Sequence, residues 1–369
     1  MSKYLVVGAG ISGSSIAACL SDDGSNKIVV IDKNPFIGGN CYDYRDSEGI
    51  MVHKYGSHIF HTSNSEVWKF VTKYSKFNTY MHKVVAVIEG IEIPIPFNFD
   101  SIHKAFPESL ANRIECKLLE KFEYGKKIPI KDFMNQDDED LRFLANYIYE
   151  NVFLHYTEKQ WGIDPSKVDG AVTARVPVHL SRDCRYFQDK YQGIPLGGYT
   201  ELISKMLDKP NIELRLNTNF KDVDCSEYDH IYYSGSIDEL LGYCYGQLPY
   251  RSVHFELETY DREFYQSGAT VNYPNNYDFT RIHEYKYYLG DTSLKTTIAK
   301  EYSEQFILGK NERYYPISSE ENEALYKKYL SEINVKYPNM TVLGRLGDYK
   351  YYDMDKAIAR ALELCGNKS

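Results

Sequence analysis

A glycine-rich turn near the N-terminus constrains the fold of this chain more than any other feature. The turn has the pattern G-x-G-x-x-G, with Gly8, Gly10 and Gly13 as its glycines. An apolar run precedes the turn, a helix-like segment follows it, and a second apolar run occupies residues 27–31. In such a unit the first glycine permits a tight turn, the second lets the backbone approach a pyrophosphate, and the third lets the helix pack on the strand. The order of strand, turn, helix and strand therefore predicts a βαβ unit that binds a dinucleotide.

An acidic residue and a helix N-terminus complete the predicted site. Asp32 follows the second strand about 20 residues after the glycines, where its carboxylate can accept hydrogen bonds from a ribose. The helix that starts near Ser12 offers free N–H groups and the positive end of its dipole to phosphates. A glycine pair at Gly38 and Gly39, after Lys33, resembles the second glycine motif of glutathione-reductase-like flavoproteins, with a simple turn as the alternative. The sequence therefore predicts FAD rather than NAD.

Length, charge and cysteine content exclude several classes of protein. A chain of 369 residues is long enough for two or three domains. The net charge of −9 argues against nucleic-acid binding, because phosphate backbones require a basic surface. The 7 cysteines include no C-x-x-C pair, so we expect reduced thiols in a cytoplasmic protein. No segment has the ~20 continuous apolar residues that a bilayer span requires, so we expect no membrane insertion.

Tyrosine is unusually abundant, at 35 residues against 17 Phe and 2 Trp. Surface positions and compositional drift account for most of these residues. Clusters of tyrosine also suit a wet cavity for a sugar or a nucleotide, because the ring packs while the hydroxyl forms hydrogen bonds.

The hydrophobic pattern predicts an α/β fold in which a Rossmann-like (glutathione-reductase-like) FAD-binding domain carries an inserted helical bundle and an antiparallel β-sheet domain. Apolar residues recur at helical spacing in residues 110–124 and 140–154, and alternate in residues 252–257 and 295–300. We assign residues 1–77, 196–240 and 338–369 to the FAD-binding domain, residues 100–165 to the helical domain, and residues 78–99, 166–195 and 241–337 to the antiparallel-sheet substrate domain, with a mobile loop at residues 168–177.

Four strings of residues carry a resemblance to a known family. They are HKYGSHIFHT at residues 53–62, YTEKQWG at 156–162, YQGIPLGGY at 191–199 and YKYYDM at 349–354. In sequence, order and spacing they resemble the bacterial type of UDP-galactopyranose mutase. One departure is Asp32, where many relatives carry Glu; both side chains can accept hydrogen bonds from ribose hydroxyls.

The resemblance implies a flavin-dependent isomerase that interconverts UDP-galactopyranose and UDP-galactofuranose. The reaction has no net redox change, yet the FAD must be reduced, because its N5 acts as the nucleophile on the anomeric carbon. The family supplies galactofuranose for cell-surface polysaccharide such as lipopolysaccharide or capsule. Its bacterial members imply a homodimer.

The same resemblance assigns catalytic roles to Arg175, Arg281 and His61. Arginine suits a departing diphosphate, because its fixed fork of donors carries a permanent charge. Arg175 lies on the expected mobile loop, which we expect to close over the substrate. Without the resemblance, each arginine would be interpreted as an ordinary surface charge.

Further residues match the family's substrate and cofactor sites, with core packing as the alternative for Trp161. The substrate-binding residues would be Tyr156, Thr157, Trp161, Tyr186, Phe187, Asn272, Tyr315, Tyr351 and Asp353. The cofactor-binding residues would be Gly8, Gly10, Ser12, Gly13, Asp32, Lys33, Gly39, Asn40, His58, Ile59, Arg345, Tyr352, Asp353 and Met354. We expect no metal: His58 and His61 have a ligand-like spacing, but no nearby Cys or acid completes a ligand set.

Two other functions are compatible with an N-terminal βαβ unit. A flavin-dependent amine oxidase would use the flavin as hydride acceptor and would need an apolar substrate tunnel, which the paired arginines and the tyrosine clusters argue against. A nucleotide-binding regulator without enzymatic activity would not need so many sequence segments rich in aromatic residues. The response to reductant distinguishes the enzymes, because the mutase requires reduced flavin while an oxidase consumes oxygen.

Overall fold

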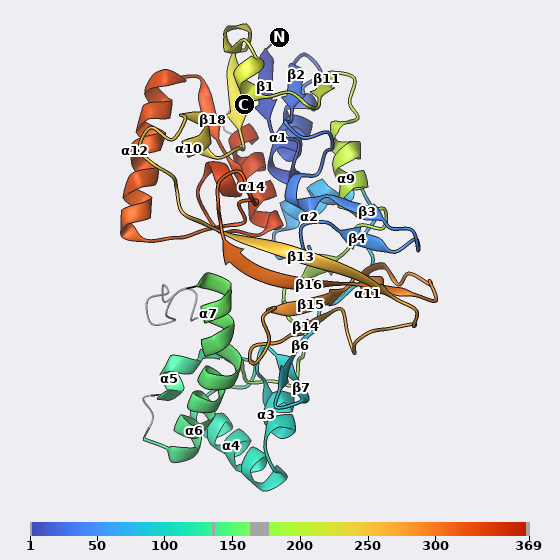
Figure 1. Ribbon diagram of the computed structural model, residues 1–369, viewed down its shortest axis with the longest axis vertical. Helices are drawn as coiled ribbons and strands as arrows, with labels where there is room; N and C mark the ends of the chain where they lie inside the picture. The colour runs from blue at the N-terminus through green and yellow to red at the C-terminus, as the bar shows by residue number, and fades with distance from the viewer. Residues whose placement is uncertain (1, 135–136, 163–176, 367–369) are drawn as a thin grey trace.

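The computed structural model describes residues 2–134, 137–162 and 177–366. Three parts follow one another along the long axis in Figure 1: a parallel sheet with its helices, a long antiparallel sheet, and a group of helices. This arrangement confirms the α/β fold class with a separate antiparallel sheet. Residues 168–176 of the expected mobile loop, and Arg175 with them, lie outside the described residues.

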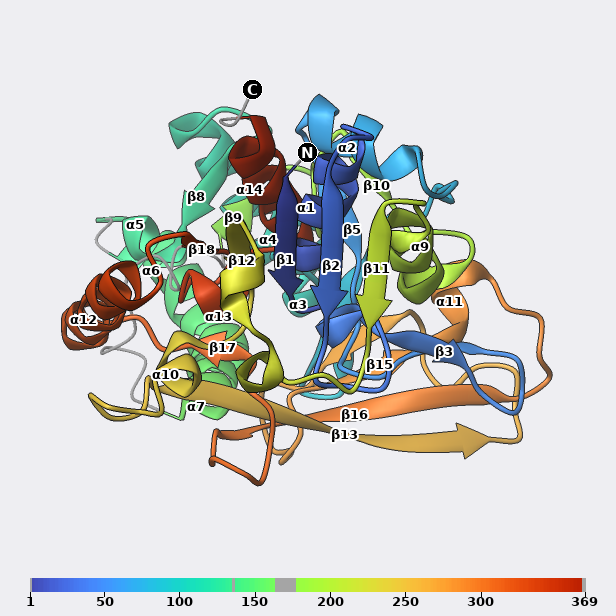
Figure 2. The same ribbon diagram turned by 90° about the horizontal axis from the view of Figure 1, so that it is seen from above.

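The parallel sheet has five strands in the order β11-β2-β1-β12-β18, and all neighbouring strands run parallel. Figure 2 shows the first four side by side. Strands β1 and β2 lie near the N-terminus of the chain, β18 lies near its C-terminus, and β11 and β12 lie between them in the sequence. Their bounds are β1 (Lys3–Val7), β2 (Lys27–Ile31), β11 (Ile212–Arg215), β12 (His230–Tyr233) and β18 (Met340–Val342).

Alternate residues of these strands pack into two different cores, because successive side chains of a strand point to opposite faces. Val6 and Val30 join a cluster with Ala17 of the helix that follows the glycine turn. Leu5 and Val29 join a second cluster on the other face. The helices around the sheet are α1 (Ile11–Ser21), α2 (Ser65–Thr72), α9 (Gly198–Leu207), α10 (Ile237–Leu240), α12 (Glu320–Lys336), α13 (Gly344–Gly347) and α14 (Met354–Gly366).

The second sheet has seven strands in the order β17-β13-β16-β15-β14-β6-β7. It is antiparallel apart from one neighbouring pair, since β14 pairs with β6 in parallel. Its bounds are β6 (Val84–Ile88), β7 (Ile91–Ile95), β13 (Tyr250–Tyr260), β14 (Thr270–Asn272), β15 (Arg281–Glu284), β16 (Thr296–Gln305) and β17 (Tyr315–Pro316). Short elements complete this region: β3 (Asp43–Arg45), β4 (Met51–His53), β5 (Phe60–Thr62), β10 (Tyr191–Gly193) and α11 (Lys286–Leu289).

The predicted helices at residues 110–124 and 140–154 are confirmed, with one difference in geometry. The second helix begins as α6 and continues beyond its end as a π-helix, Tyr149–Leu154. A π-helical turn is often found near functional sites. Two further strands that the sequence did not predict, β8 (Lys127–Pro129) and β9 (Pro177–His179), pair with each other antiparallel. No helix among the described residues is long and apolar enough to cross a bilayer. The helices of this third part of the molecule are α3 (Phe99–Ala105), α4 (Glu108–Lys121), α5 (Ile130–Met134), α6 (Glu139–Ile148) and α7 (His155–Trp161).

The expectation that all cysteines are reduced thiols is wrong for two of them. Cys19 on α1 and Cys365 on α14 form a disulfide across a sequence separation of 346 residues. The spacing of cysteines in a sequence cannot reveal this pair, because it forms only when the helix after β1 packs against the last helix. The other five cysteines are free.

The disulfide predicts a redox-dependent thermal stability. In the chain-entropy account, closing so long a loop contributes up to about 5 kcal/mol by restricting the unfolded chain. Dithiothreitol should therefore lower the thermal midpoint of the wild-type protein and leave that of Cys365→Ser unchanged in scanning fluorimetry. Cys116→Ser, which removes an exposed free thiol, should keep the wild-type response. A wild-type midpoint that does not respond to reductant contradicts the prediction.

Candidate active site

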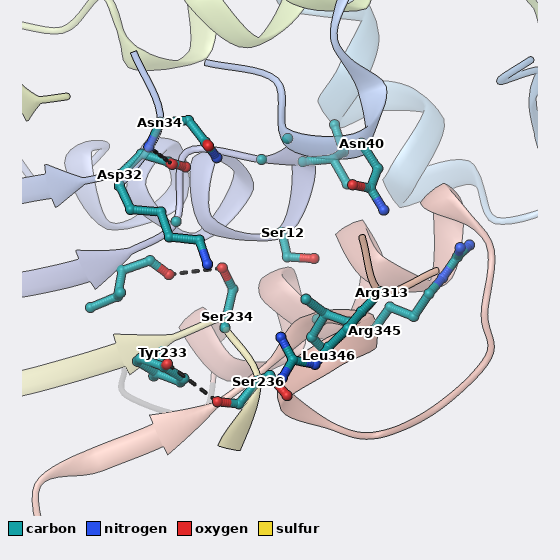
Figure 3. A pocket seen from close by; sticks show the side chains of 18 of the residues that line it. Ser12, Asp32, Asn34, Asn40, Tyr233, Ser234, Ser236, Arg313, Arg345 and Leu346 are labelled. Carbon is teal, nitrogen blue, oxygen red and sulfur yellow. Dashed lines mark hydrogen bonds between the residues drawn. The ribbon is translucent and has the colours of Figure 1, made fainter. Parts of the chain in front are cut away.

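A cavity of about 310 Å³ lies at the carboxyl ends of β1, β2 and β12, where open α/β sheets bind their ligands. Figure 3 shows Asp32 on one side of it and Arg345 on the other, with Ser12 between them. Of the residues predicted to bind a cofactor, Gly13 and Ile59 are not part of its lining. The other twelve line it: Gly8, Gly10, Ser12, Asp32, Lys33, Gly39, Asn40, His58, Arg345, Tyr352, Asp353 and Met354.

The three glycines of the turn have distinct steric roles. Gly8 has φ +105°, and a Cβ on it would overlap the Ser234 hydroxyl. A Cβ on Gly13 would overlap the carbonyl oxygen of Gly8, so this glycine allows α1 to approach the turn closely. A Cβ on Gly10 would meet no atom nearer than Gly39 Cα at 3.6 Å, because the space beside Gly10 belongs to the cavity. Gly10 therefore leaves room for a ligand, while Gly8 and Gly13 allow the turn itself.

Asp32 holds the glycine turn and also faces the cavity. Its Oδ2 accepts the Ala9 N–H at 2.8 Å and its Oδ1 accepts the Asn34 N–H at 2.9 Å. Each carboxylate oxygen retains accepting capacity, which a ribose hydroxyl could use. The carboxylate is thus fixed in position before any ligand arrives.

A second cavity of about 620 Å³ adjoins the first, and both share Asn40, His58, Arg345, Asp353 and Met354 as lining residues. The structure gathers eight of the predicted catalytic and substrate residues around it, together with Ile59. They are His61, Tyr186, Phe187, Asn272, Arg281, Tyr315, Tyr351 and Asp353.

Tyr156, Thr157 and Trp161 lie on α7 beside this second cavity and are not part of its lining. The Trp161 ring centroid lies 6.4 Å from that of Tyr315. Burial raises the pKa of Tyr156, whose hydroxyl lies within the electrostatic influence of Arg281. Thr157 is buried.

Arg281 on β15 is held by a buried carboxylate on the neighbouring strand. Its Nε donates to Glu301 Oε2 at 2.8 Å, and its Nη2 lies 2.8 Å from Glu301 Oε1. His283 Nε2 lies 3.0 Å from the same carboxylate. Burial alone would raise the pKa of Glu301, but Arg281 and His283 lower it to about 2. The two strands thus place one fixed guanidinium at the wall of the second cavity.

His58 lies at the junction of the two cavities and is held as a neutral ring. Its Nδ1 is 2.7 Å from the Gly56 carbonyl, and its backbone N–H donates to His53 Nδ1 at 3.0 Å. Burial, with a further contribution from His53, lowers the pKa of His58 to about 3. A neutral His58 adds hydrogen-bonding capacity without adding charge.

Arg345, on α13, links the two cavities. Its guanidinium carbon lies 5.8 Å from the Tyr315 ring centroid and 5.2 Å from that of Tyr351, within the range of cation–π contacts. Its Nη2 also donates to the Tyr352 carbonyl at 2.9 Å. Arg345 and Arg281 give the second cavity two guanidinium groups suited to a diphosphate, and Lys127 also lines it.

His61 has a different environment. Its Nδ1 is 2.8 Å from Asp189 Oδ2, and its ring stacks on Phe187 with centroids 3.6 Å apart and planes 13° apart. His82 lies beyond Phe187, with its Nδ1 2.9 Å from the Tyr80 hydroxyl. Burial lowers the pKa of His82 to about 3.

Sequence reasoning missed Glu301, His283, His82 and Asp189. One signal was available for His283, since it follows Arg281 by two residues on a strand and so points to the same face. Glu301 immediately follows the alternating stretch at residues 295–300 and could have been assigned to a strand. The sequence could not show that this carboxylate pairs with Arg281. His82 and Asp189 carried no local signal.

Comparisons with known proteins agree with this geometry. The family model for UDP-galactopyranose mutase matches residues 151–351, and a model for the NAD(P)-binding Rossmann-like domain matches residues 6–74. A solved structure of reduced UDP-galactopyranose mutase covers 99% of this chain and 95% of its own, with a TM-score of 0.73 and 16% identity. A putative protoporphyrinogen oxidase from Exiguobacterium has a TM-score of 0.61 at 11% identity, which shows a shared fold alone.

Three named relatives are similar to this chain over almost their whole length. A probable UDP-galactopyranose mutase from Klebsiella pneumoniae is 38% identical, with 98% of this chain and 93% of the relative aligned. A dTDP-fucopyranose mutase from Escherichia coli is 34% identical, with 98% and 97% aligned. A UDP-galactopyranose mutase from Mycoplasma pneumoniae is 34% identical, with 97% and 94% aligned. The model match spans more than half of the chain and the relatives span nearly all of it, so this chain belongs to the UDP-galactopyranose mutase family.

Proposed function

We propose that this protein is an FAD-dependent isomerase that interconverts UDP-galactopyranose and UDP-galactofuranose. The observation that carries the proposal is the junction of the two cavities. A dinucleotide site at the sheet edge opens, past His58, Asn40 and Arg345, into a polar cavity with a preorganised guanidinium, Arg281. A flavin ring and the anomeric carbon of a nucleotide sugar would meet at this junction.

The residues of the first cavity fit FAD. The first turn of α1 has no side-chain cap, because Gly10 is its N-cap, so its N–H groups are available to a pyrophosphate. Asp32 is placed for the ribose, and Gly10 leaves space for the phosphates. When bound in its reduced form, the flavin supplies the nucleophile for the anomeric carbon of a sugar whose oxidation state does not change.

Arg281 is the group best placed to hold the diphosphate. Charge develops on the diphosphate as the anomeric bond breaks, and a donor that is already fixed stabilises this charge without reorganising. Glu301 provides that fixation, and Arg281 lines the second cavity. Arg345, between Tyr315 and Tyr351, adds a second positive charge. We propose that Arg175 contributes when the substrate is bound.

The uracil and the sugar would occupy opposite parts of the second cavity. Trp161 on α7 lies beside Tyr315, and with Tyr156 of the same helix it is suited to a flat, stacked base. His61, Phe187 and Asn272 line the part that a hexose would fill. The Asn272 Oδ1 is buried without a hydrogen-bond partner among the described residues, as expected of an acceptor that serves a ligand hydroxyl.

A second candidate substrate is a dTDP-linked 6-deoxy sugar. The relative named dTDP-fucopyranose mutase is 34% identical over 98% of this chain, which equals the identity of the mutase from Mycoplasma pneumoniae. The two substrates differ at one hydroxyl of the hexose, in the nucleobase and in the pentose of the nucleotide. The interconversion of pyranose and furanose is the same reaction in both.

The amine-oxidase alternative has weaker support. Putrescine oxidase shares the fold with a TM-score of 0.55 at 11% identity, whereas the mutase relatives share up to 38%. A cytoplasmic location, a homodimer and a role in cell-surface polysaccharide stay predictions, as do the domain boundaries and the absence of nucleic-acid partners.

The proposed activity predicts turnover only with reduced enzyme. Dithionite-reduced protein should convert UDP-galactofuranose to UDP-galactopyranose in a chromatographic assay, and oxidised protein should not. A parallel assay with dTDP-fucofuranose distinguishes the two candidate substrates. Oxygen consumption with an amine substrate, together with no conversion of either nucleotide sugar, would refute the proposal.

Gly10→Val should give a colourless protein, because the added side chain would enter the space proposed for the pyrophosphate. The measurement is the flavin absorbance per polypeptide after purification, with the released cofactor identified by chromatography. Gly24→Val is a matched control, since a Cβ on Gly24 meets no atom within 4 Å. Release of FMN or NAD from the wild-type protein would contradict the assignment of FAD.

Arg281→Ala should lower kcat by about two orders of magnitude, the loss typical of removing one preorganised charge-stabilising donor. Arg281→Lys should recover part of the activity, because a point charge cannot reproduce a forked contact. Trp161→Ala should mainly raise KM, because base stacking is similar in the ground and transition states. Arg262→Ala, on an exposed surface arginine, is the control. A wild-type kcat for Arg281→Ala, at normal FAD content, would show that Arg281 is not part of the diphosphate site.

A further inference from the structure

Four histidines line the second cavity within the described part of the chain: His58, His61, His82 and His283. Three of them are unsuited to accepting a proton. Burial lowers the pKa of His58 and of His82 to about 3, and the Nε2 of His283 is engaged by Glu301, which also holds Arg281. His61 differs, because its Nδ1 is held by the carboxylate of Asp189 and not by Glu301, the carboxylate that holds Arg281.

Asp189 is fixed at both of its oxygens. Its Oδ2 lies 2.8 Å from His61 Nδ1, and its Oδ1 accepts the Ser63 hydroxyl at 2.7 Å. The backbone around it is held as well, because Gln192 Nε2 donates to the Asp189 carbonyl at 3.0 Å. The antiparallel pairing of β5 with β10 places Gln192 opposite His61, so the histidine and its carboxylate lie on one small, rigid unit.

These contacts determine the tautomer and the orientation of the His61 ring. An ionised carboxylate only accepts hydrogen bonds, so Nδ1 carries the hydrogen and Nε2 is left as an acceptor. Stacking on Phe187 fixes the plane of the ring. The side chain is 13% exposed and lines the second cavity, so Nε2 is the nitrogen available to a ligand there.

The proposed isomerisation requires a proton transfer between two oxygens of the sugar. Opening the pyranose breaks the C1–O5 bond, and O5 gains a proton. Closing the furanose forms the C1–O4 bond, and O4 loses a proton. The net change is one proton moved from O4 to O5, with no electron gained or lost, and one base can receive and return it.

We propose that His61 Nε2 exchanges this proton with the sugar oxygens, and that Asp189 is the positioning residue that holds His61 in the required tautomer. The inference rests on the proposed isomerase function and deepens it. His61 acts in ring opening and closure, whereas Arg281 acts on cleavage of the bond to the diphosphate.

The charged groups around the pair set the expected pH dependence. Burial alone would raise the pKa of Asp189, but Ser63 and His61 outweigh it and hold this pKa below its ordinary value, with a contribution from Lys356 of α14. Asp355, also on α14, accepts the Thr62 hydroxyl on β5, and His82 faces His61 across Phe187. A base can accept a proton only while its ring is neutral, and a neighbouring carboxylate favours the protonated ring. Removing the Asp189 carboxylate should therefore extend the activity of the enzyme to lower pH.

The test uses the full reduced holoenzyme and two readouts. Asp189→Asn and His61→Gln should each lower kcat for isomerisation by about 100-fold, the size typical of a lost proton-transfer group. Both should retain scrambling of ¹⁸O from the bridging to the non-bridging positions of the substrate diphosphate, because scrambling requires only that the anomeric bond break and re-form. Asp189→Asn should also move the acidic limb of kcat to lower pH, and Asp189→Glu should restore part of the rate.

His103→Gln is the matched control, because His103 is paired with Glu115 at 2.7 Å in the helical part and lines neither cavity. It should keep the wild-type kcat. An acidic limb that does not move in Asp189→Asn, a kcat of His61→Gln close to wild type, or loss of ¹⁸O scrambling together with isomerisation would each overturn the inference. If the wild-type protein isomerises no nucleotide sugar, the proposed function itself fails, and this outcome is distinct from the other three.

Discussion

The close approach of α1 to the glycine turn is the contact on which the rest of the molecule depends. A Cβ on Gly13 would overlap the Gly8 carbonyl, so any other residue would displace the helix from the sheet. Helix α1 in turn packs against α14, to which the Cys19–Cys365 disulfide ties it. The first turn of α14 contributes Met354 and Ala357 to the dinucleotide cavity. A steric condition at one glycine thus controls where the two ends of the chain meet and how the cavity between them is shaped.

The second cavity depends on a different force, the electrostatic cost of burying Glu301. An isolated buried carboxylate is strongly unfavourable, and removing one partner from a buried ion pair typically costs about 3–5 kcal/mol. Arg281 and His283 compensate that cost from the neighbouring strand, and the register that places Arg281 opposite Glu301 makes the compensation possible. The same pairing fixes the guanidinium at the wall of the cavity. The ion pair with Glu301 therefore both stabilises Arg281 and orients its guanidinium, and the pairing of two strands provides this fixed geometry.

The parts of the fold that follow from short-range patterns were predictable, and the parts that depend on distant partners were not. The turn around Gly10 and the acid at Asp32 could be found because their spacing is set by one βαβ unit. Arg281 and His61 could be named only through the resemblance, and nothing local indicated what holds them. Asp189 lies 128 positions from His61, so no local pattern joins them. The same applies to Cys19 and Cys365.

The comparison with oxidases of the same fold shows why the site rather than the fold must carry the argument for function. Putrescine oxidase and this chain share a fold, with a TM-score of 0.55, and a fold alone does not determine chemistry. An amine oxidase must expose its flavin to an apolar carbon that loses hydride. Here the cavity beside the proposed flavin site is lined by two guanidinium groups and by His61, whose ring is held by Asp189. Such groups stabilise a departing anion and transfer protons, which an isomerisation without redox change requires. The charges in the second cavity therefore favour an isomerase over an oxidase.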